Sequence, residues 1–120
     1  KNKKKIKEIL YPYKPSSKSY KLWKKYYSGA NGLFSIVVKS KKKSSVVKFV
    51  NSLELFGIGY SWGGFESLAL LQDLRDDTKY TKTRRYLRFG KDEHIVRLHI
   101  GLEDPNDSVQ DLKKSLRHIK

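Results

Sequence analysis

The sequence predicts an α+β fold, a two-layer sandwich in which a small, largely antiparallel sheet carries helices on one face. Three observations lead to this prediction. The segment 32–39, GLFSIVVK, is apolar and β-branched, as expected for a buried strand. In residues 96–100, apolar side chains alternate with Arg97 and His99, which is the period of a strand with one face in a core. The segment 105–119 instead spaces its apolar residues at helical intervals, as in a helix with one buried stripe.

The N-terminal half is predicted to hold two strands and two helices. Residues 1–18 form a basic lead-in, the short strand IKEILYP and a proline-containing loop, and residues 19–120 form the remainder of a single domain. Ser19 stands at the capping position of a helix that ends at Gly29. After strand 32–39, the segment KKKSSVVKFVNSL has the pattern of an amphipathic helix. The side chains expected to pack inward are Trp23, Tyr26 and Tyr27 in the first helix and Val46, Val47 and Val50 in the second.

The C-terminal half begins with two short apolar runs and then a charged stretch, residues 72–94, that has no clean period. Because a stretch of that length is uncommon inside a compact domain, we expect a surface excursion or a segment that contacts a partner. In the last helix, Asp104 is the expected cap and Pro105 the first helical residue. Its inward stripe is expected to consist of Val109, Leu112, Leu116 and Ile119.

A sheet covered by helices on one face only would leave its other face bare. Arg97 and His99 belong to that second face, because they alternate with the core-facing residues of their strand. We expect Trp62, in the segment GYSWGGFESL, to lie near it, beside Gly63 and Gly64, which permit close backbone approach. Something beyond these elements should therefore pack on that face.

The composition excludes several classes of protein. The chain has no cysteine, which excludes disulfides and thiolate metal sites, and its three histidines are too scattered to indicate a ligand set. No apolar run is long enough to span a membrane, and the N-terminus lacks the apolar region of a secretory signal, so we expect a cytoplasmic protein. Methionine is absent even from position 1, which favours a piece of a longer protein.

The net charge of +15 raises the alternative of a nucleic-acid or acidic-surface binding module. Lysine supplies 21 of the 27 basic residues, whereas arginine, which suits bidentate contacts with bases and phosphates, supplies 6. Lysine also occupies ordinary solvated positions along the whole chain. We therefore interpret the charge as a solvated surface and nucleic acid as the less favoured partner.

Three stretches together resemble the cystathionine β-lyases of the Cys/Met metabolism family of pyridoxal-phosphate enzymes. They are LYPYKPSSKSYKLWKKYYSGANGLFSIVVK, LELFGIGYSWGGFESL and VRLHIGLEDPNDSVQDL. The pattern YSWGG-x-ES, followed about 30 residues later by RLHIGLED, is specific, and its tryptophan is similar to the lyase branch more than to the γ-synthase branch. The resemblance runs from about residue 6 to the end and is weakest in residues 72–94.

The resemblance implies the C-terminal small domain of a fold-type I enzyme that uses pyridoxal 5'-phosphate (PLP). Family members build the cofactor site in a larger preceding domain that supplies the Schiff-base lysine, and no lysine here stands in the family's Ser-x-x-Lys context. The resemblance therefore implies that this chain holds no catalytic residue, does not bind PLP covalently and is inactive alone. Its implied partners are the upstream PLP-binding domain, L-cystathionine or a related amino acid, and further copies of the full enzyme in a homo-oligomer, a tetramer.

The resemblance also implies substrate-binding roles for four residues. Arg97 matches the family's arginine that clamps the substrate α-carboxylate, for which a planar guanidinium is suited. Ser61 and Trp62 match the loop that lines the substrate site, with backbone N–H groups available to the same carboxylate, and Tyr60 is next to them. His99 is interpreted as structural.

The implied reaction is PLP-dependent carbon–sulfur β-elimination. It converts L-cystathionine into homocysteine, pyruvate and ammonia, as in transsulfuration and methionine biosynthesis. A folded remnant that has lost its partner is the third interpretation, beside the lyase domain and the polyanion-binding module.

Overall fold

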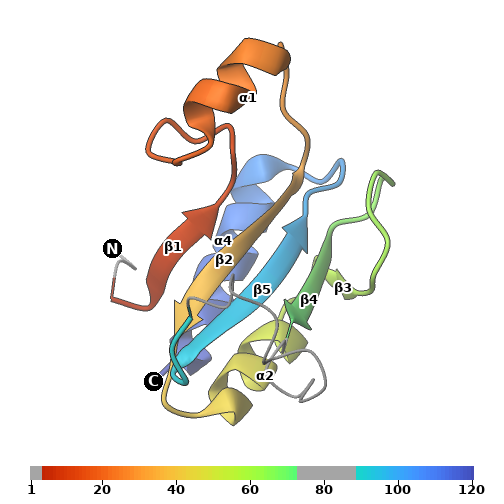
Figure 1. The fold of residues 1–120 in the computed structure, drawn as a ribbon. Helices are drawn as coiled ribbons and strands as arrows, with labels where there is room; N and C mark the ends of the chain where they lie inside the picture. Colours follow the sequence, from red (N-terminus) through yellow and green to blue (C-terminus); the bar gives the residue numbers. More distant parts are fainter. Residues whose placement is uncertain (1–3, 73–88) are drawn as a thin grey trace.

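A computed structural model of the chain describes residues 4–72 and 89–120, and within them five strands form a mixed sheet in the order β1-β2-β5-β4-β3 (Figure 1). The pairs β1–β2, β2–β5 and β4–β5 are antiparallel, and the short β3 runs parallel to β4. These pairings agree with the predicted, largely antiparallel sheet. The strands are β1 (Ile6–Leu10), β2 (Leu33–Lys39), β3 (Gly57–Ile58), β4 (Leu68–Gln72) and β5 (Glu93–His99).

Two helices pack against one face of this sheet. The helical elements are α1 (Tyr20–Tyr26), α2 (Lys43–Asn51), α4 (Pro105–Ser115) and the 3-10 turn η1 (Leu116–His118). Helix α4 lies behind the sheet in Figure 1, and α2 and η1 share one core with the sheet. Burial of each large apolar side chain there contributes about 1.5–3 kcal/mol. The buried core consists of Ile36, Val38, Val46, Phe49, Val50, Phe56, Ala69, Val96, Leu98, Leu116 and Ile119.

Helix α1 follows Ser19, as predicted, but it does not cover the sheet. In Figure 1 it stands beyond the ends of β1 and β2, and none of its residues is buried. Tyr26 and Tyr27 are exposed, whereas Trp23 makes an edge contact with the Tyr13 ring, with 4.6 Å between centroids. The predicted burial of the aromatic stripe of α1 is therefore wrong. Helical spacing shows which side chains share a face of a helix, but it does not show that another element packs against that face. The Ser19 side chain also makes no capping hydrogen bond.

One predicted core position on each of the other two helices is wrong. Val47 of α2 and Val109 of α4 are both exposed. On α2, Phe49 is fully buried instead, because it lies three residues after Val46 and therefore shares its face. On α4, Leu112 is half-buried against the core, and the predicted inward residues Leu116 and Ile119 are buried in and after η1. The buried residues of α4 are Ser108, Asp111 and Ser115.

The start of α4 is as predicted. Asp104 accepts hydrogen bonds through Oδ1 from the backbone N–H groups of Asn106 and Asp107, at 2.7 and 3.4 Å, and Pro105 is the first helical residue. These contacts satisfy N–H groups that have no partner within the helix. The helix therefore begins where its sequence indicates, although the residues on its inner face differ in part from the predicted ones.

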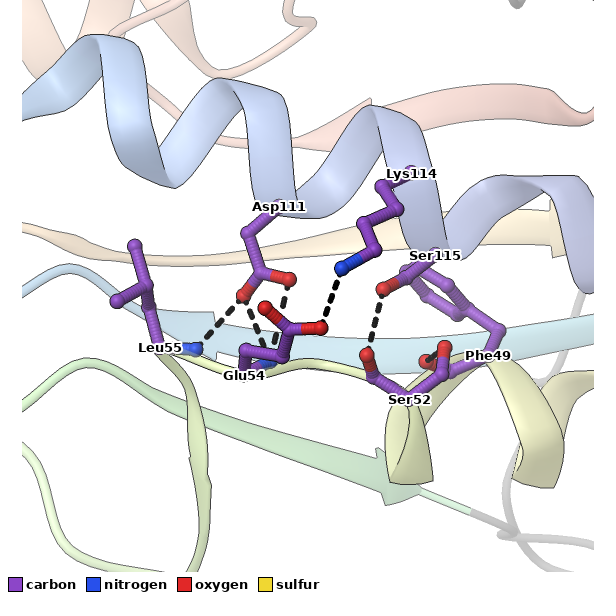
Figure 2. A network of polar contacts seen from close by, with 7 residues as sticks. All are labelled: Phe49, Ser52, Glu54, Leu55, Asp111, Lys114 and Ser115. Atoms are coloured by element: carbon purple, nitrogen blue, oxygen red, sulfur yellow. Dashed lines mark hydrogen bonds and ion pairs between the residues drawn. The ribbon is translucent and has the colours of Figure 1, made fainter.

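The polar inner face of α4 holds the segment that leads from α2 to β3 (Figure 2). Asp111 accepts hydrogen bonds from the backbone N–H of Glu54, at 3.0 and 3.1 Å to its two oxygens, and from that of Leu55 at 2.9 Å. Ser115 donates to the carbonyl of Ser52 at 3.0 Å. A buried carboxylate requires such partners, because without them nothing would compensate for the hydration that it loses on burial. Asp111 therefore fixes the path by which the chain enters β3.

The two ends of the described chain also meet. Lys5, just before β1, donates through Nζ to the carbonyl of Leu116 at 3.0 Å. The hydroxyl of Ser40, the residue after β2, lies 3.0 Å from the carbonyl oxygen of Lys42 and 3.3 Å from that of Lys120, and its single proton is shared between these two acceptors. The Lys5 bond therefore joins the edge strand β1 to the C-terminal turn, and Ser40 brings the end of the chain close to the end of β2.

The sheet face turned away from α2 and α4 carries Arg97 and His99, as predicted, but it is not bare along its length. Val37 and His99 are buried on this face, and Arg97 is half-buried. The strand pairings place Ser35, Arg97 and Leu70 in one row across β2, β5 and β4. The end of the face near His99 lies against the loop that follows β3.

Most of the predicted charged excursion, residues 72–94, lies outside the described residues. Its first residue belongs to β4, and its last two belong to β5. Residues 73–88 fall between the two described ranges, so the interpretation of this stretch stays a prediction.

We predict that Asp111→Asn lowers the free energy of unfolding by about 1–3 kcal/mol, because the amide carries no negative charge and places an NH2 donor against the backbone N–H of Glu54, which bonds to both carboxylate oxygens. Urea denaturation measures this loss. Asp107→Asn, on an exposed position of the same helix, is the control and should cost less. Equal losses in the two variants would contradict an anchoring role for Asp111.

Candidate functional site

The loop of residues 59–67, here called the tryptophan loop, carries three of the four predicted substrate-site residues, and the fourth reaches it from β5. Arg97 donates through Nη2 to the carbonyl oxygens of Gly59 and Ser61, each at 3.3 Å, and to that of Tyr60. Trp62 is the next residue along the loop. The structure therefore brings Arg97 against the backbone of Tyr60 and Ser61, which are far from it in sequence and directly precede Trp62.

The contact differs from the prediction in one respect. Carbonyl oxygens of the tryptophan loop, and not its N–H groups, bind the guanidinium, and all three hydrogen bonds use Nη2 of Arg97. The positive charge is stabilised by the negative ends of three backbone dipoles, so the contact is mainly electrostatic. Bidentate binding of a carboxylate pairs Nη2 with either Nε or Nη1, so a carboxylate bound in this way would share Nη2 with the loop carbonyls or compete with them for it.

Trp62 is not a core residue. It is 64% exposed, and Tyr60 is 77% exposed. Phe65 of the same loop is also exposed, as is Leu102, whose N–H donates to the Phe65 carbonyl at 2.8 Å. Exposed apolar side chains that gather in this way mark an interaction surface or the wall of a ligand site.

His99 holds the tryptophan loop at a second point. Its ring is 5% exposed, and Nε2 lies 3.2 Å from the backbone nitrogen of Gly63 and 3.1 Å from the carbonyl oxygen of Gly64. The prediction of a structural histidine agrees with these contacts. Nδ1 of the ring is buried and has no hydrogen-bond partner among the described residues.

A third attachment joins the end of the tryptophan loop to the segment after β5. Ser67 is fully buried, and its N–H and hydroxyl donate to the two oxygens of Glu103, at 2.9 and 2.6 Å. The same hydroxyl accepts from the N–H of Gly101 at 2.9 Å. The Ser67 hydroxyl, followed by the backbone N–H groups of Ser67 and Glu103, lowers the pKa of the Glu103 carboxyl below its ordinary value.

The close backbone approach occurs at Gly101 and not at the predicted glycines. A Cβ atom at Gly101 would lie 2.1 Å from the carbonyl oxygen of Phe65, whereas one at Gly63 or Gly64 would meet nothing within 4 Å. Gly63 is needed for another reason, since its φ of +79° lies in the left-handed region. The sequence reasoning missed Ser67, Gly101 and Glu103, although all three stand in the motifs FESL and HIGLED, because spacing alone does not show that these motifs pair.

The described residues around Arg97 do not by themselves fit PLP. A PLP site requires a Schiff-base lysine, a partner for the ring nitrogen and a phosphate cradle. Here Arg97 and His99 bond to this chain's own backbone, no lysine shares those contacts, and the nearby Glu103 is occupied by Ser67. Three hollows along residues 4–72 and 89–120, one beside α1, one beside β1 and one between Glu54 and α4, are not lined by Arg97 or the tryptophan loop. The described part of the chain supplies one wall of a site at most.

A second apolar surface surrounds α1. A groove of about 530 Å³ lies between this helix, the loop before it and the residues that lead into β2. Composition could have indicated it, because aromatic residues flank Pro12 and recur in α1. Its aromatic lining consists of Tyr11, Tyr13, Trp23, Tyr26 and Tyr27.

Two kinds of feature are absent from the described residues. Within those ranges, no helix combines the length and hydropathy needed to cross a bilayer. The same residues contain no cluster of three histidine, aspartate or glutamate side chains placed to hold a metal ion.

Comparison with known proteins identifies one family. The family model described as "Cys/Met metabolism PLP-dependent enzyme" matches residues 1–117. A cystathionine beta-lyase of Bordetella avium is 37% identical over 115 residues, and the cystathionine beta-lyase MetC of Escherichia coli is 33% identical over 115 residues. An L-alanine/L-glutamate racemase of Wolbachia pipientis is 36% identical over 116 residues. These matches cover 95–96% of this chain but only 28% of each relative.

Solved structures agree on the fold. A cystathionine gamma synthase from Xanthomonas oryzae pv. oryzae, crystallised in complex with cystathionine, superposes with a TM-score of 0.75 over 95% of this chain and 29% of that chain, at 20% sequence identity. The same enzyme in complex with aminoacrylate and cysteine gives a TM-score of 0.76 at 21% identity. The chain thus spans little more than a quarter of the length of the proteins it matches.

We predict that Gly101→Ala lowers the free energy of unfolding by about 1–3 kcal/mol, because the added methyl group collides with the backbone of the tryptophan loop at Phe65. Gly64→Ala, which adds the same group where nothing lies within 4 Å, is the matched control and should cost less. Thermal or urea unfolding of both variants makes the comparison. A larger loss at Gly64 would contradict the assignment of the close approach to Gly101.

We predict that Glu103 makes folding stability fall on acidification. Its folded pKa lies below the ordinary glutamate value of 4.5, so its contribution is present above that pH and is lost as the pH falls through the folded pKa. In Glu103→Gln the decrease in stability between pH 7 and pH 3 should therefore be smaller than in the parent chain. Glu66→Gln, at an exposed position in the tryptophan loop, is the control, and the measurement is urea unfolding at a series of pH values.

Proposed function

Because the chain belongs to the Cys/Met metabolism PLP-dependent enzyme family, we propose that it is the C-terminal, substrate-carboxylate-binding domain of a cystathionine β-lyase. The observation that carries this proposal is the position of Arg97 beside Tyr60, Ser61 and Trp62, on the sheet face that the helices α2 and α4 leave uncovered. The reaction would be β-elimination of L-cystathionine to homocysteine, pyruvate and ammonia.

In this proposal Arg97 binds the α-carboxylate of the amino-acid substrate. A guanidinium can hold both carboxylate oxygens at once, which fixes the orientation of the substrate as well as its charge. The hydrogen bonds of Nη2 to the tryptophan loop restrain the guanidinium before substrate binds, so less side-chain entropy is lost on binding. Trp62, exposed beside it, would form an apolar wall for the remainder of the substrate.

The proposal assigns the cofactor and its lysine to a separate, upstream PLP-binding domain. Two observations support a partner of that kind. The described residues around Arg97 do not form a PLP site alone, and the tryptophan loop exposes Tyr60, Trp62 and Phe65. We extend the proposal to a homo-oligomeric, tetrameric full enzyme and to an inactive isolated chain, since one wall of a site cannot position a reaction.

A second candidate reaction is amino-acid racemisation. It is favoured by the 36% identity to the L-alanine/L-glutamate racemase, which equals the identity to the lyases within a few per cent. An α-carboxylate clamp at Arg97 would serve either reaction, because both substrates are α-amino acids. The tryptophan loop and the upstream domain would then determine which reaction follows.

A hybrid enzyme tests the proposed function. The C-terminal segment of the Escherichia coli cystathionine beta-lyase, 28% of that protein, is replaced by this chain, and pyruvate release from L-cystathionine is measured together with PLP content. We expect activity in the hybrid and none in the isolated chain. A PLP-loaded hybrid that racemises alanine or glutamate but does not cleave cystathionine would support the second candidate. An inactive hybrid, together with salt-sensitive binding of the isolated chain to DNA, would support the polyanion-binding alternative.

In the same hybrid we predict that Arg97→Ala raises the apparent KM for cystathionine by roughly 30- to 1,000-fold, the equivalent of about 2–4 kcal/mol for a lost charged pair. Arg97→Lys should recover only part of this loss, because an ammonium keeps the charge without the planar pair of donors. Arg117→Ala, at an exposed arginine on η1, is the control. Unchanged kinetics in Arg97→Ala would show that the carboxylate is bound elsewhere.

A further inference from the structure

His99 lies two residues after Arg97 on the same face of β5, and the proposed function gives it no part. Alternate residues of a strand are about 7 Å apart on one face. Arg97 binds the tryptophan loop at residues 59–61, and Nε2 of His99 lies within hydrogen-bond distance of the Gly63 nitrogen and the Gly64 carbonyl oxygen. Trp62 is therefore bracketed in sequence by two attachments that come from one strand.

The position of the proton on the His99 ring determines which backbone group of the loop forms a hydrogen bond with it. A neutral imidazole offers at Nε2 either a lone pair or a proton. With a lone pair, Nε2 accepts from the N–H of Gly63, and with a proton it donates to the carbonyl of Gly64. The ring cannot satisfy both groups at once.

The buried Nδ1 distinguishes the two states. It has no partner among the described residues, so a proton on Nδ1 would be an orphaned, buried N–H. Buried N–H groups without a partner are rarer than under-satisfied acceptors, because a donor has a single proton to place. In the favoured state Nε2 carries the proton and donates it to the Gly64 carbonyl, while the N–H of Gly63, an exposed residue, is hydrated instead of bonding to Nε2.

We propose that His99 is a positioning residue of the tryptophan loop, which it holds through an Nε2–H hydrogen bond to the Gly64 carbonyl so that Trp62 keeps its place beside Arg97. The attachment stabilises the turn at Gly63, whose φ of +79° would otherwise be one of several states open to a glycine. The proposal rests on the proposed function only in treating the loop as part of the substrate site. The attachment itself belongs to this chain alone.

The test uses the 120-residue chain with Trp23→Phe, so that Trp62 is its only tryptophan. Fluorescence anisotropy of Trp62 reports how firmly the loop is held. His99→Phe keeps a ring but removes Nε2, and we expect a loss of anisotropy. His99→Gln should restore it, because the glutamine amide nitrogen is the same number of bonds from Cβ as Nε2. His99→Asn, one bond shorter, should not.

His94→Phe is the matched control. His94 is also a buried histidine of β5, but its Nε2 lies 3.1 Å from the Ser40 carbonyl at the other end of the strand. We expect this variant to lower the free energy of unfolding without a change in Trp62 anisotropy. An equal loss of anisotropy in the two phenylalanine variants would mean general loosening of the fold and would overturn the proposal.

Two further measurements keep the proposal testable if His99→Phe does not fold. The comparison of His99→Gln with His99→Asn then decides alone, and equal anisotropy in these two would contradict it. The ¹⁵N chemical shifts of the His99 ring identify its tautomer, and a proton on Nδ1 would contradict the bond to Gly64. None of these measurements requires enzyme activity, so an inactive hybrid enzyme would count against the proposed function and leave this inference standing.

Discussion

The attachment of the tryptophan loop to strand β5 is the interaction on which the candidate site depends. Strand β5 has side chains on both faces of the sheet, and the two faces make different contacts. Val96 and Leu98 join the core beneath the helices, while Arg97 and His99 bind the loop on the other face. The period of two residues that defines a strand thus connects the stability of the domain to the geometry of the site. Any change that shifts the register of β5 by one residue would exchange the two sets.

The irregular segments near the site are held by polar contacts to backbone, and apolar packing contributes less to them. Asp111 holds the chain that leads into β3, and Glu103 holds Ser67, where the tryptophan loop ends. Such bonds are directional, so they define a position more narrowly than apolar contact does. They also leave the aromatic side chains of the loop exposed, since none of those side chains is needed to keep the loop in place. A surface built in this way can serve a partner without rearrangement of the domain.

Strands and helix ends were predictable where the residues of the element itself form the pattern that defines it. The strands β2 and β5 follow from β-branched residues and alternation, and the start of α4 follows from Asp104 and Pro105. Burial on the helices was less predictable. Val109 satisfied the helical period yet is exposed, because hydrogen bonds of Asp111 to a distant segment set the rotation of α4. A single sequence contains no direct sign of such a long-range bond.

The candidate site was likewise predictable only in part. Arg97 and Trp62 could be named from the motifs in which they stand, and Arg97 reaches the loop that carries Trp62. The direction of the contact between Arg97 and the tryptophan loop, through carbonyl oxygens, could not be predicted, because it depends on how the loop turns after β3. The close approach at Gly101 is a contact between its backbone and that of Phe65, so it could not be predicted from the pattern of side chains.

The bond of Lys5 to the Leu116 carbonyl has a consequence for how the domain opens. A strand at the margin of a sheet normally frays first, independently of the rest. Here the release of β1 also breaks the bond of Lys5 to the final turn, so fraying of this strand costs that contact in addition to its pairing with β2. One contact thus couples the opening of the first strand to that of the last turn, although more than a hundred residues separate them along the polypeptide.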